Sequence, residues 1–415
     1  MANNLLTISK ITNEALMVLE NELTFTSEVD RNYDDQFAVV GGKIGNTVNV
    51  RRPGRFIGTT GPALNVEDFN ETSVPVTLST QFHVDTQFTT QDLALSLDMF
   101  SDRVLKPAVA AVANKIDRDG LVMAKNSTAN IVGTAGTPPT GLITYLTAGA
   151  YLDSEGAPRD GRRSCTVEPF TAATIVDSLK GLFVPQEAIG EQYRKGLMGR
   201  DSAGMNWKMD QNVVSHQFGS YSSAVLSCNV TTATGFLTSG WASSSNITIA
   251  ATSAGSAALN QGDVITIAGV YAVNPQNRQA YGSNKLRNFV VNSAVTVPSS
   301  GSVTVNVSPA VITAGQFQNV TVTSTGSQSV VPFNNTGVVS PQNIIMHRNA
   351  FTLACADLEL PDGVHFAGRA SDKEIGLSMR VVRQYTINND SIPTRLDVLY
   401  GWAPLYPELA CRVAA

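Results

Sequence analysis

The side chains that most often carry out chemistry are sparse in this 415-residue sequence, and their spacing forms none of the usual sites. No two of the four histidines stand in the H-x-H or H-x-x-x-H spacing that lets two imidazoles bind one metal ion. No two of the four cysteines form a C-x-x-C pair, so we expect buried thiols and neither a zinc site nor a disulfide framework. These residues are His83, His216, His347, His365, Cys165, Cys228, Cys355 and Cys411.

Three further patterns each lack a part that catalysis needs. Residues 41–46 (GGKIGN) miss the G-x-x-x-x-G-K-[ST] spacing that cradles phosphate, and therefore predict a turn. His83 and Asp85 lie on one face of a predicted strand, where a structural pair is the interpretation we adopt. Asp117 and Asp119 stand two residues apart on a predicted helix and do not face each other. The sequence predicts no catalytic, cofactor-binding or metal-binding residue, and we expect a protein that is not an enzyme.

One cluster of charged residues has a spacing that suits binding. Lys43, Arg51, Arg52 and Arg55 lie near or beside a Gly/Pro/Asn-rich tip between two alternating, strand-like runs, which predict a long hairpin over residues 44–88. Such a hairpin could pack on its own domain. It could also reach another subunit, where guanidinium groups fork onto carboxylates. We expect these four residues to make inter-subunit contacts.

Composition limits what the elements around these residues can form. A chain of 415 residues exceeds one usual hydrophobic core, so we expect two or more domains. Charged residues are sparse at 15% while Ser, Thr, Val, Asn and Gly are plentiful, which favours a β-rich fold. The net charge of −5 argues against a general nucleic-acid binder. No apolar run reaches the roughly 18 residues that span a bilayer. Glu14, Glu20 and Glu22 interrupt the N-terminus where a signal peptide needs an apolar core, so we expect an unexported protein.

The longest segment with helical periodicity covers residues 91–126. Thr90 can cap its start, and Pro107 must kink or restart the helix because proline has no N–H to donate. Residues 107–125 would form a rod of roughly 28 Å. An amphipathic core helix is one interpretation, and a structural spine is the other. The apolar stripe comprises Val109, Val112, Ala113, Ile116, Gly120 and Met123.

The remaining segments surround a β-rich insert. Residues 5–23 predict an amphipathic arm that docks on its own core or on a neighbouring chain. Residues 222–340 carry short alternating runs between turns, which predict a small sandwich or barrel. Other expected elements are a short element at 142–148, helices at 170–184, 188–199 and 344–358, and strands at 206–214 and within 373–413. The charged residues of the insert are Asp263, Arg278, Lys285 and Arg287.

This order of parts resembles the tailed-phage major capsid protein family of the HK97 type, and the insert makes it similar to the P22-type coat proteins. The resemblance rests on QFTTQDLALSLDMFSDRVLKPAVAAVANKID (from 87), GAPRDGRRS (from 156), LKGLF and IGEQYRKGLMG (within 179–199), MDQNVVSHQFGS (from 209), MHRNAFTLACADLELPDGVHF (from 346) and RLDVLYGWAPLYPELACRV (from 395). It implies an α+β capsid fold whose parts are an N-terminal arm (1–43), an extended loop hairpin (44–88), a peripheral domain with the spine helix (89–129), an axial domain (130–221), an inserted all-β barrel or Ig-like domain (222–340), an axial return (341–370) and a peripheral return (371–415).

The resemblance also implies a function. It is that of a major capsid protein forming pentamers and hexamers of an icosahedral procapsid or head around double-stranded DNA, without sequence-specific binding, cofactor or membrane. A scaffolding protein and a portal are implied partners, with assembly in the host cytoplasm and location in the virion capsid. The family's insert can carry a charged loop that bridges capsomers, whereas residues 240–255 have no charge, so that contact is absent or polar and apolar. The alternative is a surface or secreted β-rich adhesion module.

Overall fold

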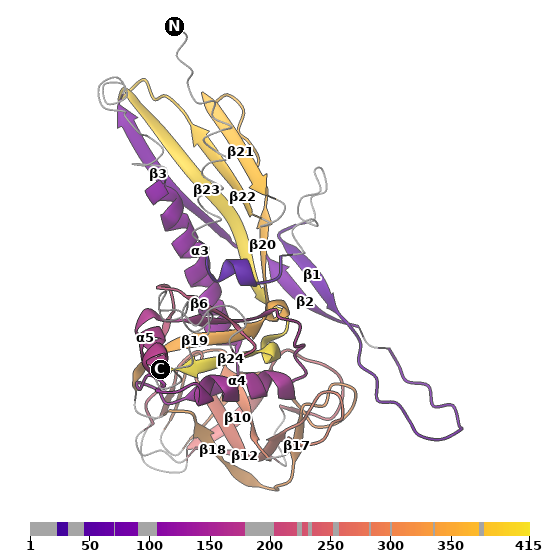
Figure 1. Ribbon diagram of the computed structural model, residues 1–415. Coiled ribbons are helices and arrows are strands. Elements are labelled where there is room, and N and C mark those ends of the chain that lie inside the picture. The colour runs from indigo at the N-terminus through magenta and orange to yellow at the C-terminus, as the bar shows by residue number, and fades with distance from the viewer. Residues whose placement is uncertain are drawn as a thin grey trace, which may run out of the picture. The chain divides into compact units, whose positions relative to one another are not determined.

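A computed structural model describes residues 23–31, 45–69, 71–89, 106–178, 203–221, 226–230, 235–251, 257–281, 284–298, 301–334, 337–372 and 377–415 (Figure 1). The chain divides into two compact units. The first comprises residues 1–50, 74–120 and 351–403, and the second comprises residues 51–73, 121–350 and 404–415. No helix in these described ranges combines the length and the apolar character needed to cross a bilayer.

The first unit contains a five-stranded sheet beside the N-terminal part of helix α3 (Lys106–Ser127). Four strands follow the order β20–β23–β22–β21, and β3 pairs antiparallel with β23 from Thr89↔Ser391 to Thr80↔Tyr400. Leu396, Val398 and Tyr400 of β23 share one face of the sheet and are buried, within the segment 373–413 where strands were predicted. The strands are β3 (Thr80–Thr89), β20 (Phe351–Ala356), β21 (Phe366–Asp372), β22 (Leu377–Arg383) and β23 (Ser391–Pro404).

Helix α3 confirms the predicted apolar stripe. Val109, Val112 and Ile116 are fully buried, and the helix is described from Lys106 onward. Residues 90–105 of the predicted helix lie outside the described residues. Gly120 lies under the ring of Trp402, and an added Cβ would sit 2.6 Å from Cζ2. A side chain at position 120 would therefore prevent the helix from approaching β23 this closely.

Asp117 on α3 is buried, and it fixes the described part of the N-terminal arm. Its carboxylate accepts hydrogen bonds from the backbone N–H groups of Thr24, Phe25 and Thr26, at 2.7, 3.2 and 3.0 Å. Burial raises the pKa of Asp117, and these hydrogen bonds oppose the rise. The short η1 helix (Thr26–Glu28) thus docks on its own chain. The rest of the predicted arm, residues 5–22, lies outside the described residues.

The second unit contains a six-stranded mixed sheet and a β-barrel. The sheet follows the order β4–β24–β19–β5–β6, with β7 pairing β19, and α4 (Ile143–Ser154) and α5 (Pro169–Ser178) belong to the same unit. Tyr145 and Leu152 of α4 are buried with Trp207 in one apolar cluster. The strands are β4 (Ile131–Gly133), β5 (Arg163–Val167), β6 (Asn206–Met209), β7 (Ser215–Gln217), β19 (Val339–His347) and β24 (Ala410–Ala414).

The insert is a closed six-stranded barrel. The strands pair in the cycle β13–β15–β10–β8–β18–β12, with β12 returning to β13, and β17 (Val320–Val322) also pairs β12. Ile247, Ile249, Ile265 and Ile267 all point inward, which confirms the predicted alternation. Closure removes the open edges that a sandwich would leave. The barrel strands are β8 (Leu226–Asn229), β10 (Ser245–Ala251), β12 (Val264–Ala272), β13 (Leu286–Val291), β15 (Ser302–Ser308) and β18 (Ser327–Pro332), and the short pairs are β9 (Phe236–Leu237) with β16 (Val311–Ile312) and β11 (Ala257–Leu259) with β14 (Val295–Val297).

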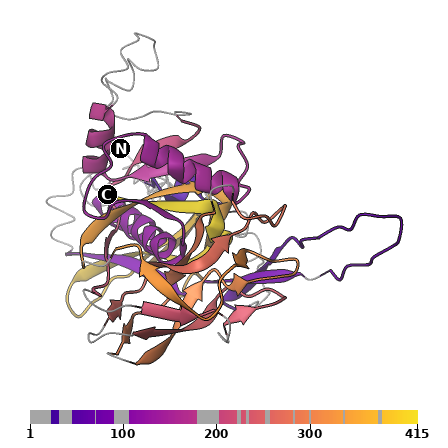
Figure 2. The ribbon, with the colours of Figure 1, turned by 90° about the horizontal axis from the view of Figure 1, so that it is seen from below.

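The predicted hairpin forms around a long excursion. β1 (Thr47–Arg52) and β2 (Thr72–Thr77) pair as a two-stranded sheet, and Figure 2 shows the chain leaving it between these strands. The second strand-like run of the predicted hairpin is interrupted at residues 78–79, so that β2 and β3 enter different sheets.

Several predicted elements differ from the structure. The helix predicted at 344–358 is wrong, because these residues form the end of β19, a 3-10 turn (η4, Arg348–Ala350) and β20. The strand predicted at 206–214 ends at Met209, while the element predicted at 142–148 continues to Ser154. The helix predicted at 170–184 is seen as α5 as far as the described residues extend, and the one at 188–199 lies outside them. β20 and β21 join the first unit's sheet, and β24 joins the second unit's sheet.

Candidate functional site

The extended loop, residues 51–73, is folded upon itself. The rings of Phe56 and Phe69 stack with centroids 5.9 Å apart and planes inclined by 22°. The Glu67 carboxylate accepts hydrogen bonds from the backbone N–H groups of Ile57 at 2.7 Å and Gly58 at 2.6 Å. A Cβ at Gly54 would lie 2.4 Å from Cε2 of the Phe69 ring, so any other residue at this position would require that ring to shift. The two sides of the loop are therefore tied together across its width.

Large apolar side chains gather on this loop and face solvent. Leu64 is 89% exposed and Val66 is 78% exposed, and Phe56, Ile57 and Phe69 are each about half exposed or more. Single exposed apolar residues are ordinary on protein surfaces, but a contiguous set is typical of an interaction site. We call these five residues the apolar loop surface. This surface was not predicted from the sequence, although F-I and A-L-N-V-E-D-F within a Gly/Pro-rich tip were visible signals.

The predicted arginine cluster divides into different environments. Arg52 is bound within its own chain, with Nη2 2.8 Å from Oε1 of Glu408 and its guanidinium 4.2 Å from the Tyr406 ring. Its side chain is only 12% exposed, and the Trp241 ring of the inserted domain lies 5.7 Å away. Arg52 therefore holds the base of the extended loop, and it is not free in this chain to meet a neighbour.

The other members of the cluster are more open. Arg51 is 79% exposed, with Nη1 3.4 Å from Oε2 of Glu71, and Arg55 Nη2 lies 3.9 Å from Oε1 of Glu408. Lys43 lies outside the described residues. Exposed ion pairs of this kind contribute about 0–1 kcal/mol, so these arginines can exchange partners at little expense.

The barrel is fixed to the six-stranded sheet and α4 by buried polar contacts. His216 Nε2 lies 2.8 Å from Oδ1 of Asp263, and both side chains are buried. Burial lowers the pKa of His216, against the opposing effect of Asp263. Arg287 pairs with Glu155, which also accepts a hydrogen bond from the Tyr281 hydroxyl at 2.7 Å. These contacts join groups that burial would otherwise destabilise.

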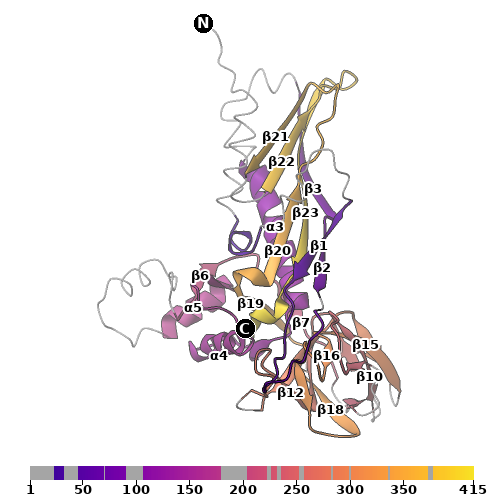
Figure 3. The ribbon, with the colours of Figure 1, turned by 90° about the vertical axis from the view of Figure 1, so that its right-hand side faces the viewer.

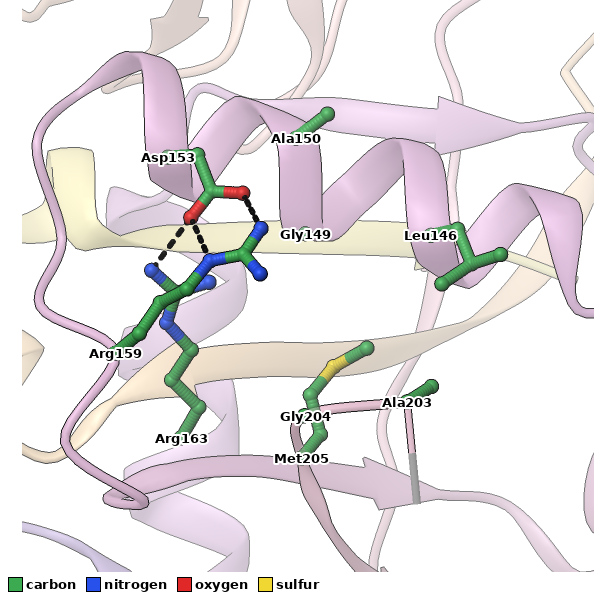
Figure 4. Close-up of a pocket in the computed structure, with 9 residues that line it drawn as sticks. All are labelled: Leu146, Gly149, Ala150, Asp153, Arg159, Arg163, Ala203, Gly204 and Met205. Atoms are coloured by element: carbon green, nitrogen blue, oxygen red, sulfur yellow. Dashed lines mark hydrogen bonds and ion pairs between the residues drawn. The ribbon is translucent and has the colours of Figure 1, made fainter. Parts of the chain in front are cut away.

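A small cavity of about 180 Å³ lies between α4 and the turn that precedes β5 (Figure 4). The Asp153 carboxylate accepts hydrogen bonds from Arg159 and from Arg163, whose Nη2 is 2.7 Å away. The hydrogen bond from Arg159 helps hold the pKa of Asp153 below its usual value. Both guanidinium groups are thus occupied by one carboxylate, and the arrangement fastens the turn to the helix.

The remaining residues considered from the sequence show no catalytic arrangement. His83 Nδ1 lies 2.9 Å from Oδ2 of Asp85, and both side chains are exposed on β3. The four cysteines are free and buried, as predicted, and burial raises the pKa values of Cys165 and Cys411. Within the described ranges, no three His, Cys, Asp or Glu side chains gather as metal ligands.

One family model matches nearly the whole sequence. The model of the family described as P22 coat protein, gene protein 5, matches residues 1–412. No curated protein matches the chain. Among solved structures, a chain of Mycobacterium phage Che8 is 12% identical with a TM-score of 0.44, covering 94% of this chain and 90% of that one. The capsid of cyanophage P-SCSP1u is 9% identical (TM-score 0.45, 89% and 84% covered), and that of Ralstonia phage GP4 is 8% identical (TM-score 0.43, 92% and 84% covered).

Proposed function

The chain belongs to the P22 coat protein family, and from this premise we propose how its copies hold one another in a shell. It is a major capsid protein with the HK97-type fold, and its copies assemble into the icosahedral capsid of a tailed-phage virion. The alternative of an adhesion module is not favoured. The mode of contact is the open question, because the family match does not assign a role to any single residue.

We propose that the apolar loop surface packs against a neighbouring copy of the chain. The observation that supports this is the exposure of Leu64 and Val66 on a loop that is internally fastened by the Phe56–Phe69 stack. Fully burying one such side chain contributes about 1.5–3 kcal/mol, so a few of them give a contact in the millimolar range. Many weak contacts in a closed lattice add up to a stable shell, while a wrongly placed subunit can still leave.

Charged residues have a secondary role in this proposal. Arg51 and Arg55, with Lys43, would lie at the edge of the contact and pair with carboxylates of the neighbour. Arg52 would act within its own chain, through Glu408. Because exposed ion pairs contribute little, reversing the charge of Arg51 and Arg55 would slow assembly without unfolding the subunit.

The wider proposal concerns partners and parts. The six-stranded sheet with α4 and α5 would be the axial domain, α3 the spine of the peripheral domain, and the barrel an external insert. A scaffolding protein and a portal would direct assembly in the host cytoplasm. The shell would enclose double-stranded DNA without sequence-specific contacts, in keeping with the net charge of −5, and the chain would have no catalytic activity.

The test is the pair of substitutions Leu64→Glu and Val66→Glu, with Thr59→Glu and Thr60→Glu as a control that adds the same charge to exposed polar positions of the loop. We expect the first variant to keep the melting temperature of the unassembled protein and to fail to close shells in negative-stain micrographs and sedimentation. The control should form shells. Normal shells from the Leu64/Val66 variant would contradict the proposed contact.

A further inference from the structure

The inserted domain is poor in charge, and each of its charged residues contacts another part of its own chain. Asp263 binds His216 of β7, Arg287 binds Glu155 after α4, and the Lys285 ammonium lies 4.7 Å from the ring centre of Tyr151 in α4. The fourth, Arg278, turns away from these contacts. Its Nη2 donates a hydrogen bond to the backbone carbonyl of Phe56 in the extended loop, at 2.8 Å.

Arg278 adopts a backbone conformation that is unusual for an arginine. It lies in the turn between β12 and β13 with φ of 55°, in the left-handed region where glycine or asparagine is favoured. The turn is organised by Asn274, whose Oδ1 accepts the Gln276 N–H and whose carbonyl accepts the Arg278 N–H. Because glycine or asparagine would suit this turn better, the arginine is explained by the contact that its long side chain makes with the extended loop.

A second residue of the barrel holds the other side of the extended loop. Gln316, in the turn before β17, donates from Nε2 to the backbone carbonyl of Asp68 at 2.7 Å. Phe56 and Asp68 bracket the tip, so the barrel holds both sides of the loop at these two residues. The loop is seen in front of the barrel in Figure 3, and its tip projects away from the barrel in Figure 1. Both contacts use main-chain oxygens, which leaves the apolar loop surface uncovered.

We propose that the inserted barrel is a platform for the extended loop of the same subunit, with Arg278 and Gln316 as its positioning residues. By holding two carbonyls, the barrel sets where the loop is presented and reduces the conformational entropy that a neighbouring subunit must remove on binding. This proposal rests on the proposed function of the loop only where it concerns binding between subunits in the shell. The contact within one subunit can be measured before any assembly.

The experiment is limited chymotrypsin digestion of the purified, unassembled full-length chain. Chymotrypsin cleaves after Phe56 and Phe69, and the carbonyl of the first bond is the group that Arg278 binds. The test variant is Arg278→Asn with Gln316→Ala, because asparagine tolerates the left-handed backbone and neither change alters a chymotrypsin site. The control is Gln328→Ala, which removes a hydrogen bond only to the carbonyl of Thr325 in its own turn.

Losing one hydrogen bond of ordinary strength raises the open population about two- to tenfold, so the double variant should be cut after Phe56 about tenfold faster. Cleavage elsewhere and the melting temperature should match the wild type and the control. An unchanged rate after Phe56 in the double variant would overturn the platform. If the loop is released but Leu64→Glu with Val66→Glu still closes shells, the platform stands and the proposed contact fails. If instead the Leu64→Glu/Val66→Glu variant fails to close shells while the double variant is cut after Phe56 at the wild-type rate, the proposed contact stands and the platform fails.

Discussion

The contact between Gly120 of α3 and Trp402 of β23 can be tested by whether Gly120→Ala raises or lowers the free energy of unfolding. Replacing glycine by alanine inside a helix normally stabilises a protein by about 1 kcal/mol. At Gly120, however, the new Cβ would lie 2.6 Å from Cζ2 and 2.9 Å from Cε2 of the Trp402 ring. The ring has little room to move, because the Phe25 ring centroid is 5.7 Å away on the same unit. Overpacking of this kind costs about 1–3 kcal/mol, so we expect Gly120→Ala to destabilise the protein by about 1 kcal/mol net.

Gly149 of α4 supplies the matched control. It is also inside a helix, but the nearest atom to an added Cβ is the terminal methyl of Met205, at 4.0 Å. Gly149→Ala should therefore stabilise by up to about 1 kcal/mol. Both variants can be compared by urea unfolding of the unassembled chain, followed by tryptophan fluorescence and circular dichroism. Equal stabilisation by both alanines would refute the argument that Trp402 limits position 120. Adding Trp402→Phe should relieve the strain of Gly120→Ala and so recover part of its loss.

Two further predictions concern the contacts between the barrel and the six-stranded sheet. Burial, with Arg412 and Lys125 nearby, lowers the pKa of His216 below its unfolded value of about 6.5, although Asp263 opposes this. Folding thus favours the neutral imidazole, so its contribution to the free energy of unfolding is fully present above pH 6.5 and falls as the pH drops toward the folded pKa, by at most about 1.4 kcal/mol per pH unit. Melting curves from pH 7.5 to 5 should show this slope, and His216→Gln should flatten it. Glu155→Gln should destabilise by about 3–5 kcal/mol in urea unfolding because it leaves the Arg287 cation buried without its counter-charge, whereas Glu155→Leu with Arg287→Met should lose much less; equal losses would contradict this.

Periodicity predicted the elements whose two faces differ. The apolar stripe of α3 and the inward isoleucines of β10 and β12 were predictable because one face is buried and the other is not. The segment 344–358 has no such contrast, since Phe351 and most of its neighbours are buried on both faces, and an apolar run without a period does not distinguish strand from helix.

Contacts between residues far apart in the chain could not be predicted from the sequence. Arg52 and Glu408 are separated by 356 positions, and nothing near either one indicates the other. The sequence placed Asp117 on a helix without indicating its burial, because that burial depends on backbone N–H groups of Thr24–Thr26 that lie more than 90 positions away. The apolar loop surface was predictable in principle, but the arginines beside it suggested ionic contacts, which are the weaker interaction at a surface.

The use of charge in the inserted domain also bears on how capsomers meet. Every charged residue of the barrel is engaged with its own chain, by an ion pair, a hydrogen bond or a cation–ring contact. A salt bridge from Asp263 or Arg287 to another capsomer would have to break a buried ion pair first, and it would leave His216 or Glu155 without its partner at considerable expense. The uncharged segment 240–255 points the same way. We therefore expect the insert of this coat protein to organise its own subunit, and any contact that residues 240–255 make with other capsomers to rest on polar and apolar groups.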